Sequence, residues 1–179
     1  MLFRLGRAAL LGSLRSRTFA EMVVPGSAAA ASAASASPAA AAATTTAEER
    51  AEAAAMRSGG SGAARAGSAA VARCSLEEGI QKYVVVEAAG LHYVSGVCAA
   101  DYHKDAARPL LDKLNAAGLS YTVLGGGRIT VDSASRTVQI YGYSYGFPWA
   151  NGVFRHDLAA KVVEQAYEGW DVKTSDEGY

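Results

Sequence analysis

The sequence is poor in the features that mark several large classes of protein. Only two cysteines, Cys74 and Cys98, occur in 179 residues, which excludes a disulfide framework and a cysteine-based metal site. Basic and acidic residues balance at 17 each, whereas a nucleic-acid-binding domain is usually basic, so we expect no nucleic-acid partner. No stretch approaches the ~18 consecutive apolar residues of a membrane span, so we expect no membrane insertion.

Large apolar side chains are scarce in the first part of the chain, although half of all residues count as hydrophobic. Alanine, serine, threonine and glycine dominate residues 25–75, and such a segment buries too little area to offset its chain entropy. We therefore predict a disordered linker at 25–75, with at most a transient helix at Glu48–Met56. A single folded domain is predicted for residues 76–179, where aromatic and β-branched residues appear.

Acidic residues are absent from the first twenty positions, where four arginines occur. Arg4, Arg7 and Arg15 fall on one face of a helix, and leucines supply an apolar component. This pattern is typical of a mitochondrial presequence. We predict that residues 1–24 form a targeting segment for mitochondria; the alternatives are a plastid transit peptide and a cytoplasmic protein with a disordered basic start.

Alternating and helical hydrophobic patterns divide the domain into strands and helices. The order predicts an α+β or α/β domain with one mixed β-sheet of about six strands and two packed helices. The second helix is predicted at 157–167, with Leu158, Val162, Val163 and Ala166 facing inward. The strands are predicted at 81–87, 91–97, 120–124, 129–131, 137–143 and 170–174.

The start of the first helix is open, because Pro109 lies close to it. A proline deep in a helix removes a hydrogen bond and clashes with the preceding turn. We therefore predict that this helix begins near Asp105, with that side chain as N-cap, and ends before Gly118. His103 would then stand just before the helix; an earlier start would predict a kink at Pro109.

Three consecutive glycines and an arginine form the most informative stretch, Leu124-Gly-Gly-Gly-Arg-Ile129. Glycines accept positive φ, so their N–H groups can turn into one concavity that binds an anion. Arg128 would add bidentate donation to a phosphate or carboxylate. The alternative is a plain hairpin turn or bulge followed by a solvated arginine.

Three further motifs accompany this stretch: Asp101-Tyr-His103, Ile140-Tyr-Gly-Tyr-Ser144 and Asp176-Glu-Gly-Tyr179. With Leu124-Gly-Gly-Gly-Arg-Ile129, they resemble the phosphohistidine phosphatase (Janus/ocnus) family. The resemblance covers residues 82–179, and it implies a metal-independent protein phosphatase that needs no cofactor. Its substrates would be histidine-phosphorylated proteins, with phospholysine as a further substrate, and we expect a monomer.

The resemblance also implies the site residues. His103 matches the family's catalytic histidine, and Lys82 and Arg128 match cations near the phosphate. The loop that holds the phosphate oxygens corresponds to Ser144, Tyr145 and Gly146. Each residue alone would also suit a structural role: a surface or capping histidine, an edge lysine, a serine that bonds its own turn.

Alternatives remain open for both mechanism and function. Histidine titrates near neutrality, so His103 could act as general base toward water or as nucleophile. Ser95 stands where the family often has an arginine, which suggests a catalytically weak phosphopeptide- or anion-binding module as the second reading. A third reading is a single-stranded nucleic-acid binder that stacks bases on tyrosines, but the neutral net charge disfavours it.

Overall fold

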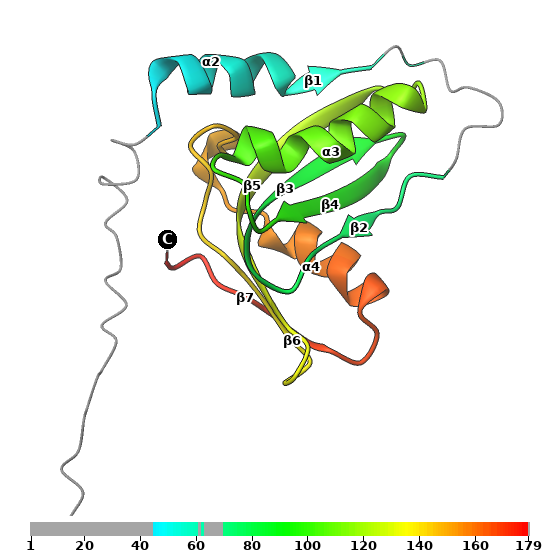
Figure 1. Cartoon of the computed structure of the whole chain (residues 1–179), viewed down its shortest axis with the longest axis vertical. Coiled ribbons are helices and arrows are strands. Elements are labelled where there is room, and N and C mark those ends of the chain that lie inside the picture. The colour runs from blue at the N-terminus through cyan, green and yellow to red at the C-terminus, as the bar shows by residue number, and fades with distance from the viewer. Residues whose placement is uncertain (1–44, 61, 63–69, 179) are drawn as a thin grey trace, which may run out of the picture. The chain divides into compact units, whose positions relative to one another are not determined.

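The computed structural model describes residues 45–60, 62 and 70–178, so the predicted targeting segment at 1–24 lies outside the described residues. The described elements are shown in Figure 1. In chain order they are α2 (Ala47–Met56), β1 (Ser58–Gly59), β2 (Cys74–Ser75), β3 (Gly79–Ala88), β4 (Leu91–Val97), α3 (His103–Ala116), β5 (Tyr121–Asp132), β6 (Thr137–Tyr141), the 3-10 helix η1 (Ala150–Gly152), α4 (His156–Ala166) and β7 (Asp171–Thr174).

One mixed sheet organises the chain, as predicted. Its strand order is β2-β4-β3-β5-β6-β7, and β1 joins β5 beside this path. The central strands β4, β3, β5 and β6 are antiparallel, whereas β2 pairs with β4 and β6 with β7 in parallel. The α+β class expected from the order of strands and helices is confirmed.

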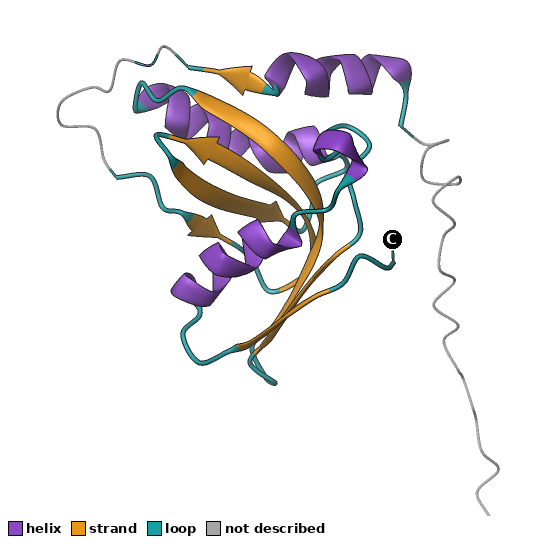
Figure 2. Ribbon diagram, turned by 180° about the vertical axis from the view of Figure 1, so that it is seen from behind, coloured by secondary structure: helices purple, strands orange, loops and turns teal. Residues whose placement is uncertain are grey.

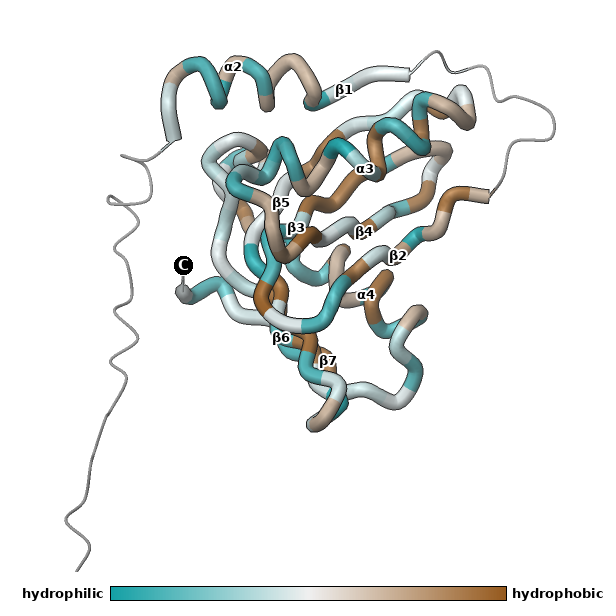
Figure 3. Tube along the Cα trace, viewed as in Figure 1, coloured by the Kyte–Doolittle hydropathy of each residue, from teal (hydrophilic) through white to brown (hydrophobic). Residues whose placement is uncertain are grey.

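The two helices α3 and α4 cover opposite faces of the sheet, because each strand presents alternate side chains to each face. Val84 and Val86 of β3 belong to one core with Leu110 and Leu114 of α3. Tyr83 and Val85 belong to the other core, whose helical members include Val162 and Val163. Figures 1 and 2 show α3 and α4 on the two sides of the sheet, and Figure 3 shows apolar residues alternating with polar ones along α3. Ala166, predicted to face inward, is exposed.

The triple glycine forms neither the predicted anion-binding nest nor the alternative hairpin turn. Residues 121–132 are one continuous strand, β5, and none of the three glycines has positive φ. Antiparallel pairing with β3 runs from Tyr121 to Val131, with one register shift between Val85 and Val86, where β5 passes from Val123 to Gly125. The expectation of an anion-binding nest at 125–127 is therefore wrong, because cross-strand hydrogen bonds hold these glycines in extended conformation.

The helix α3 begins earlier than predicted, at His103, with Tyr102 in the N-cap position. Asp105 is not the N-cap; its Oδ2 accepts a hydrogen bond from the Tyr102 backbone N–H at 3.1 Å. Pro109 lies inside the helix on its exposed face. Water can solvate the carbonyl that loses its partner there, which is how an outer helix face accommodates a proline.

Residues 47–59 are more ordered than we expected. They form α2 and β1, and Ala53 of α2 is buried in the core beneath α3. The sequence contains a signal for this helix, Thr46-Ala-Glu-Glu49, which is the pattern of a capping box. Both of its hydrogen bonds are present: Thr46 Oγ1 accepts from Glu49 N at 3.2 Å, and Glu49 Oε2 accepts from Thr46 N at 2.8 Å.

Candidate functional site

His103 occupies the first turn of α3 and is buried against the sheet, with 8% of its surface exposed. Its Nε2 lies 3.0 Å from the carbonyl oxygen of Gly127 on β5. A carbonyl can only accept a hydrogen bond, so Nε2 carries the proton and Nδ1 carries the lone pair of the neutral ring. The contact joins two of the sequence motifs and fixes the tautomer of the imidazole.

Burial lowers the pKa of His103 to about 4, since the charged form loses hydration. The hydrogen bond to Gly127 opposes this shift, whereas the positive charges of Lys82 and Arg128 lower the pKa further. At neutral pH the imidazole is therefore uncharged, and Nδ1 is available to accept a proton or to attack an electrophile.

Two cations lie on the same face of the sheet as His103. Lys82 of β3 and Arg128 of β5 are direct cross-strand partners, and Lys82 shares its face with Val84 beneath α3. Lys82 Nζ donates a hydrogen bond of 2.8 Å to the carbonyl oxygen of Ala100, in the loop that leads into α3. Burial lowers the pKa of Lys82 and the charge of Arg128 lowers it further, while Asp101 and Asp105 raise it. The pair forms a positive patch next to the neutral imidazole.

Gly126 allows the parts of this site to approach one another. A Cβ at this position would collide with the Tyr83 carbonyl oxygen and would lie 3.3 Å from His103 Cδ2 and 3.4 Å from Ser144 Cβ. The imidazole and the serine therefore meet over a residue that has no side chain. The sequence predicts that these glycines supply N–H groups; at Gly126 the structure instead shows close approach of neighbouring groups.

The loop after β6 supplies the remaining predicted residues. Ser144 is buried, and its Oγ accepts a hydrogen bond of 3.1 Å from the Phe147 backbone N–H, so it closes its own turn while its hydroxyl proton can still be donated. Tyr145 contacts Tyr143, with 2.7 Å between the two hydroxyls. Gly146 lies against Ala53 of α2. The structure thus brings together four of the predicted site residues: His103, Lys82, Arg128 and Ser144. The contacts of Tyr145 and Gly146 given above are with Tyr143 and Ala53, which lie beside the site.

Ser95 adds no charge to this surface. Its side chain is buried beneath α3, and its Oγ donates a hydrogen bond of 3.3 Å to the Ala106 carbonyl oxygen.

Within the described residues, no group of three or more histidine, cysteine, aspartate or glutamate side chains could hold a metal ion. The same part of the chain contains no helix of the length and apolar character that a bilayer crossing requires.

Comparison with known proteins agrees with these motifs. A model of the Janus/Ocnus family matches residues 68–171. The chain belongs to the Janus/Ocnus family. The matched span includes His103, Lys82, Arg128 and the loop at 144–146, and it leaves out α2 and β1.

Relatives in this family carry two kinds of name. The sex-regulated protein janus-A of Drosophila pseudoobscura pseudoobscura is 29% identical over 113 residues, which cover 58% of this chain and 73% of the relative. The 14 kDa phosphohistidine phosphatase of Sus scrofa is 26% identical over 113 residues, covering 57% of this chain and 86% of the relative. The protein of that name from Homo sapiens is also 26% identical, over 57% of this chain and 87% of its own length.

Proposed function

We propose that this Janus/Ocnus protein is a protein histidine phosphatase that hydrolyses the phosphoramidate bond of phosphohistidine. One observation carries the proposal: a buried imidazole, neutral at pH 7 and fixed by Gly127, lies beside the cross-strand cations Lys82 and Arg128. The phosphatase names among the relatives support the same assignment.

The chemistry of phosphoryl transfer suits this arrangement. A phosphoryl group on imidazole carries about two negative charges, and its transfer passes through a loose transition state, so positioning and charge stabilisation dominate. Lys82, Arg128 and the N-terminus of α3 favour the anion. A bound dianion raises the pKa of a neighbouring imidazole, so His103 becomes more basic when substrate is present.

Two routes use the lone pair on Nδ1 of His103. In the first, Nδ1 takes a proton from water while the water oxygen bonds to phosphorus. The P–N bond breaks, and the released imidazole nitrogen takes up a proton. In the second, Nδ1 itself bonds to phosphorus and releases the substrate imidazole, and water then cleaves the phosphoenzyme. Rapid acid-free quenching with radiolabelled substrate distinguishes the routes, because only the second leaves label on the protein.

The deciding experiment measures phosphate release from a phosphohistidine peptide by the full chain. Wild type should release phosphate, and His103→Ala should not, while circular dichroism shows both variants folded. His92→Ala is the matched control, because His92 is a partly exposed histidine on β4. Equal activity of wild type and His103→Ala would overturn the proposal.

A second candidate function rests on Ser95, which leaves the site without a further positive charge. In that case the protein binds phosphohistidine peptides without turnover. Saturable binding of the peptide by wild type, with no phosphate released over hours, would favour the binding module.

Substrate proteins, location and assembly belong to the proposal as well. We propose that the substrates are histidine-phosphorylated proteins, that the protein acts as a monomer and that residues 1–24 direct it to mitochondria. A fusion of residues 1–24 to a fluorescent reporter tests the location, and a diffuse cytosolic signal would contradict it. Sedimentation of the full chain tests the monomer.

A further inference from the structure

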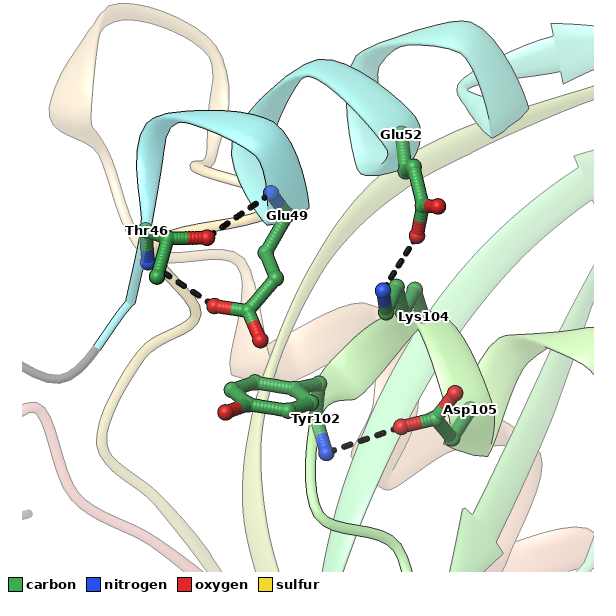
Figure 4. Close-up of polar contacts among 6 residues, drawn as sticks. All are labelled: Thr46, Glu49, Glu52, Tyr102, Lys104 and Asp105. Atoms are coloured by element: carbon green, nitrogen blue, oxygen red, sulfur yellow. Dashed lines mark hydrogen bonds and ion pairs between the residues drawn. The ribbon is translucent and has the colours of Figure 1, made fainter.

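Residues 46–59, comprising α2 and β1 with their N-cap, contact both sides of the candidate site; we call them the N-terminal clamp. Its first set of contacts is with the N-terminal turn of α3 (Figure 4). Glu52 forms an ion pair with Lys104, the residue directly after His103. The Glu49 carboxylate accepts a hydrogen bond from the side chain of Tyr102, the residue directly before His103, and this bond raises the pKa of Tyr102. The clamp therefore binds both chain neighbours of the imidazole.

The second set of contacts is with the loop at 144–148. Ala53 is 1% exposed, and a Cβ added at Gly146 would lie 3.0 Å from its methyl carbon. Arg57 Nη2 donates a hydrogen bond of 2.9 Å to the Pro148 carbonyl oxygen. The same loop carries Ser144, so the clamp packs against the segment that is predicted to bind phosphate.

Backbone pairing anchors the clamp to the sheet. β1 pairs antiparallel with the start of β5, where Ser58 faces Thr122 and Gly59 faces Tyr121. The Val123 N–H donates a hydrogen bond of 2.7 Å to the Arg57 carbonyl oxygen. Since β6 pairs only with residues 128–132 of β5, this half of the strand would otherwise present unpaired edge groups.

We propose that the N-terminal clamp is a positioning element of the site. It fixes the position of the loop at 144–148 relative to the first turn of α3. This inference rests on the proposed function, because the two segments it joins are those that carry His103 and Ser144. They are far apart in the sequence, and a displacement of about 1 Å between catalytic groups can cost up to a hundredfold in rate. The family match at 68–171 does not include the clamp.

Ala53→Leu is the sharpest test, because a larger side chain at this position must push against Gly146. Ala54→Leu is the matched control, since Ala54 is exposed on the same helix. We measure hydrogen exchange of the backbone amides at 144–147 and at 103–106 in the full chain. Ala53→Leu should speed exchange in both segments by about tenfold and lower kcat by at least about tenfold with KM less affected, while Ala54→Leu should match wild type.

Arg57→Met is the second variant, needed if Ala53→Leu does not fold. It keeps the apolar stem and removes the donors to the carbonyl oxygens of Pro148 and Val123. Arg50→Met, on the exposed side of α2, is its control. Faster exchange at 144–147 in Arg57→Met, but not in Arg50→Met, supports the clamp. Unchanged exchange and unchanged kcat in a folded Arg57→Met would overturn it. If wild type releases no phosphate, the proposed function fails, and the exchange data alone still decide whether the clamp orders the loop.

Discussion

The Nε2 atom of His103 lies 3.0 Å from the carbonyl oxygen of Gly127, across the interface between α3 and β5. This contact sets the proton on Nε2 and leaves the Nδ1 lone pair as the basic position of a ring that is buried among positive charges. The first predictions concern how that ring titrates.

Activity should persist well below pH 6.5. The pKa of His103 is lowered to about 4 by burial and by the charges of Lys82 and Arg128, and the neutral ring is the active form. We expect kcat/KM to stay constant from neutral pH into the mildly acidic range and to fall as pH drops through that pKa. Rates corrected for spontaneous hydrolysis of the substrate test this; a fall centred near 6.5 would show that the imidazole is hydrated in the free protein.

The same shift predicts how stability depends on pH. Between pH about 4 and pH 6.5, the ordinary pKa of histidine, His103 binds a proton in the unfolded chain but not in the folded one. The free energy of unfolding should therefore be at its full value above pH 6.5 and should decrease as pH falls toward 4. Urea unfolding at several pH values measures the slope, and His103→Asn should show a smaller slope than wild type; equal slopes would contradict burial of the ring.

Lys82→Met should weaken binding of the phosphoryl group in the transition state, and it should raise the pKa of His103. Loss of one charged contact to the phosphoryl group costs about 1.5–3 kcal/mol, or roughly ten- to a hundredfold in kcat/KM. Removing the neighbouring charge also shifts the acid limb of the pH profile upward. Lys113→Met, in the exposed last turn of α3, is the control, and a profile that moves equally in both variants would argue against a role for Lys82.

Gly126→Ala and Gly125→Ala should separate stability from activity. A methyl group at 126 meets the Tyr83 carbonyl oxygen and His103, whereas one at 125 meets the Trp149 ring. Both should lower the free energy of unfolding by about 1–3 kcal/mol through overpacking. Turnover per folded molecule should fall only in Gly126→Ala; an equal fall in both variants would mean that strain in β5, rather than displacement of the imidazole, limits activity.

Tyr83→Phe should lower stability and leave the site intact. Tyr83 is fully buried on the α4 face, and its hydroxyl lies 2.6 Å from Nδ1 of His156. Removing the hydroxyl leaves a buried ring nitrogen without this partner, at a cost of about 1–3 kcal/mol. Thermal unfolding measures the loss, and kcat at a temperature where both proteins are folded should not change. A large fall in kcat would place Tyr83 in the catalytic machinery.

The sequence alone determined the elements whose patterns are local. Alternation of apolar residues predicted the strands β3, β4 and β6, and helical spacing predicted α4 within one residue at each end. These predictions succeed because a strand or helix with one buried face must repeat at its own period. The motif set was also sufficient to identify the family, since the comparisons select the same one.

Tertiary structure decided the features that depend on partners distant in the chain. Three glycines have no conformational preference of their own, and only pairing with β3 made 125–127 part of a strand. The register of that pairing, rather than any local pattern, placed Lys82 opposite Arg128. The packing of α3 on β5 brought His103 to Gly127, and a core position for Ala53 turned a short alanine-rich stretch into a packed helix.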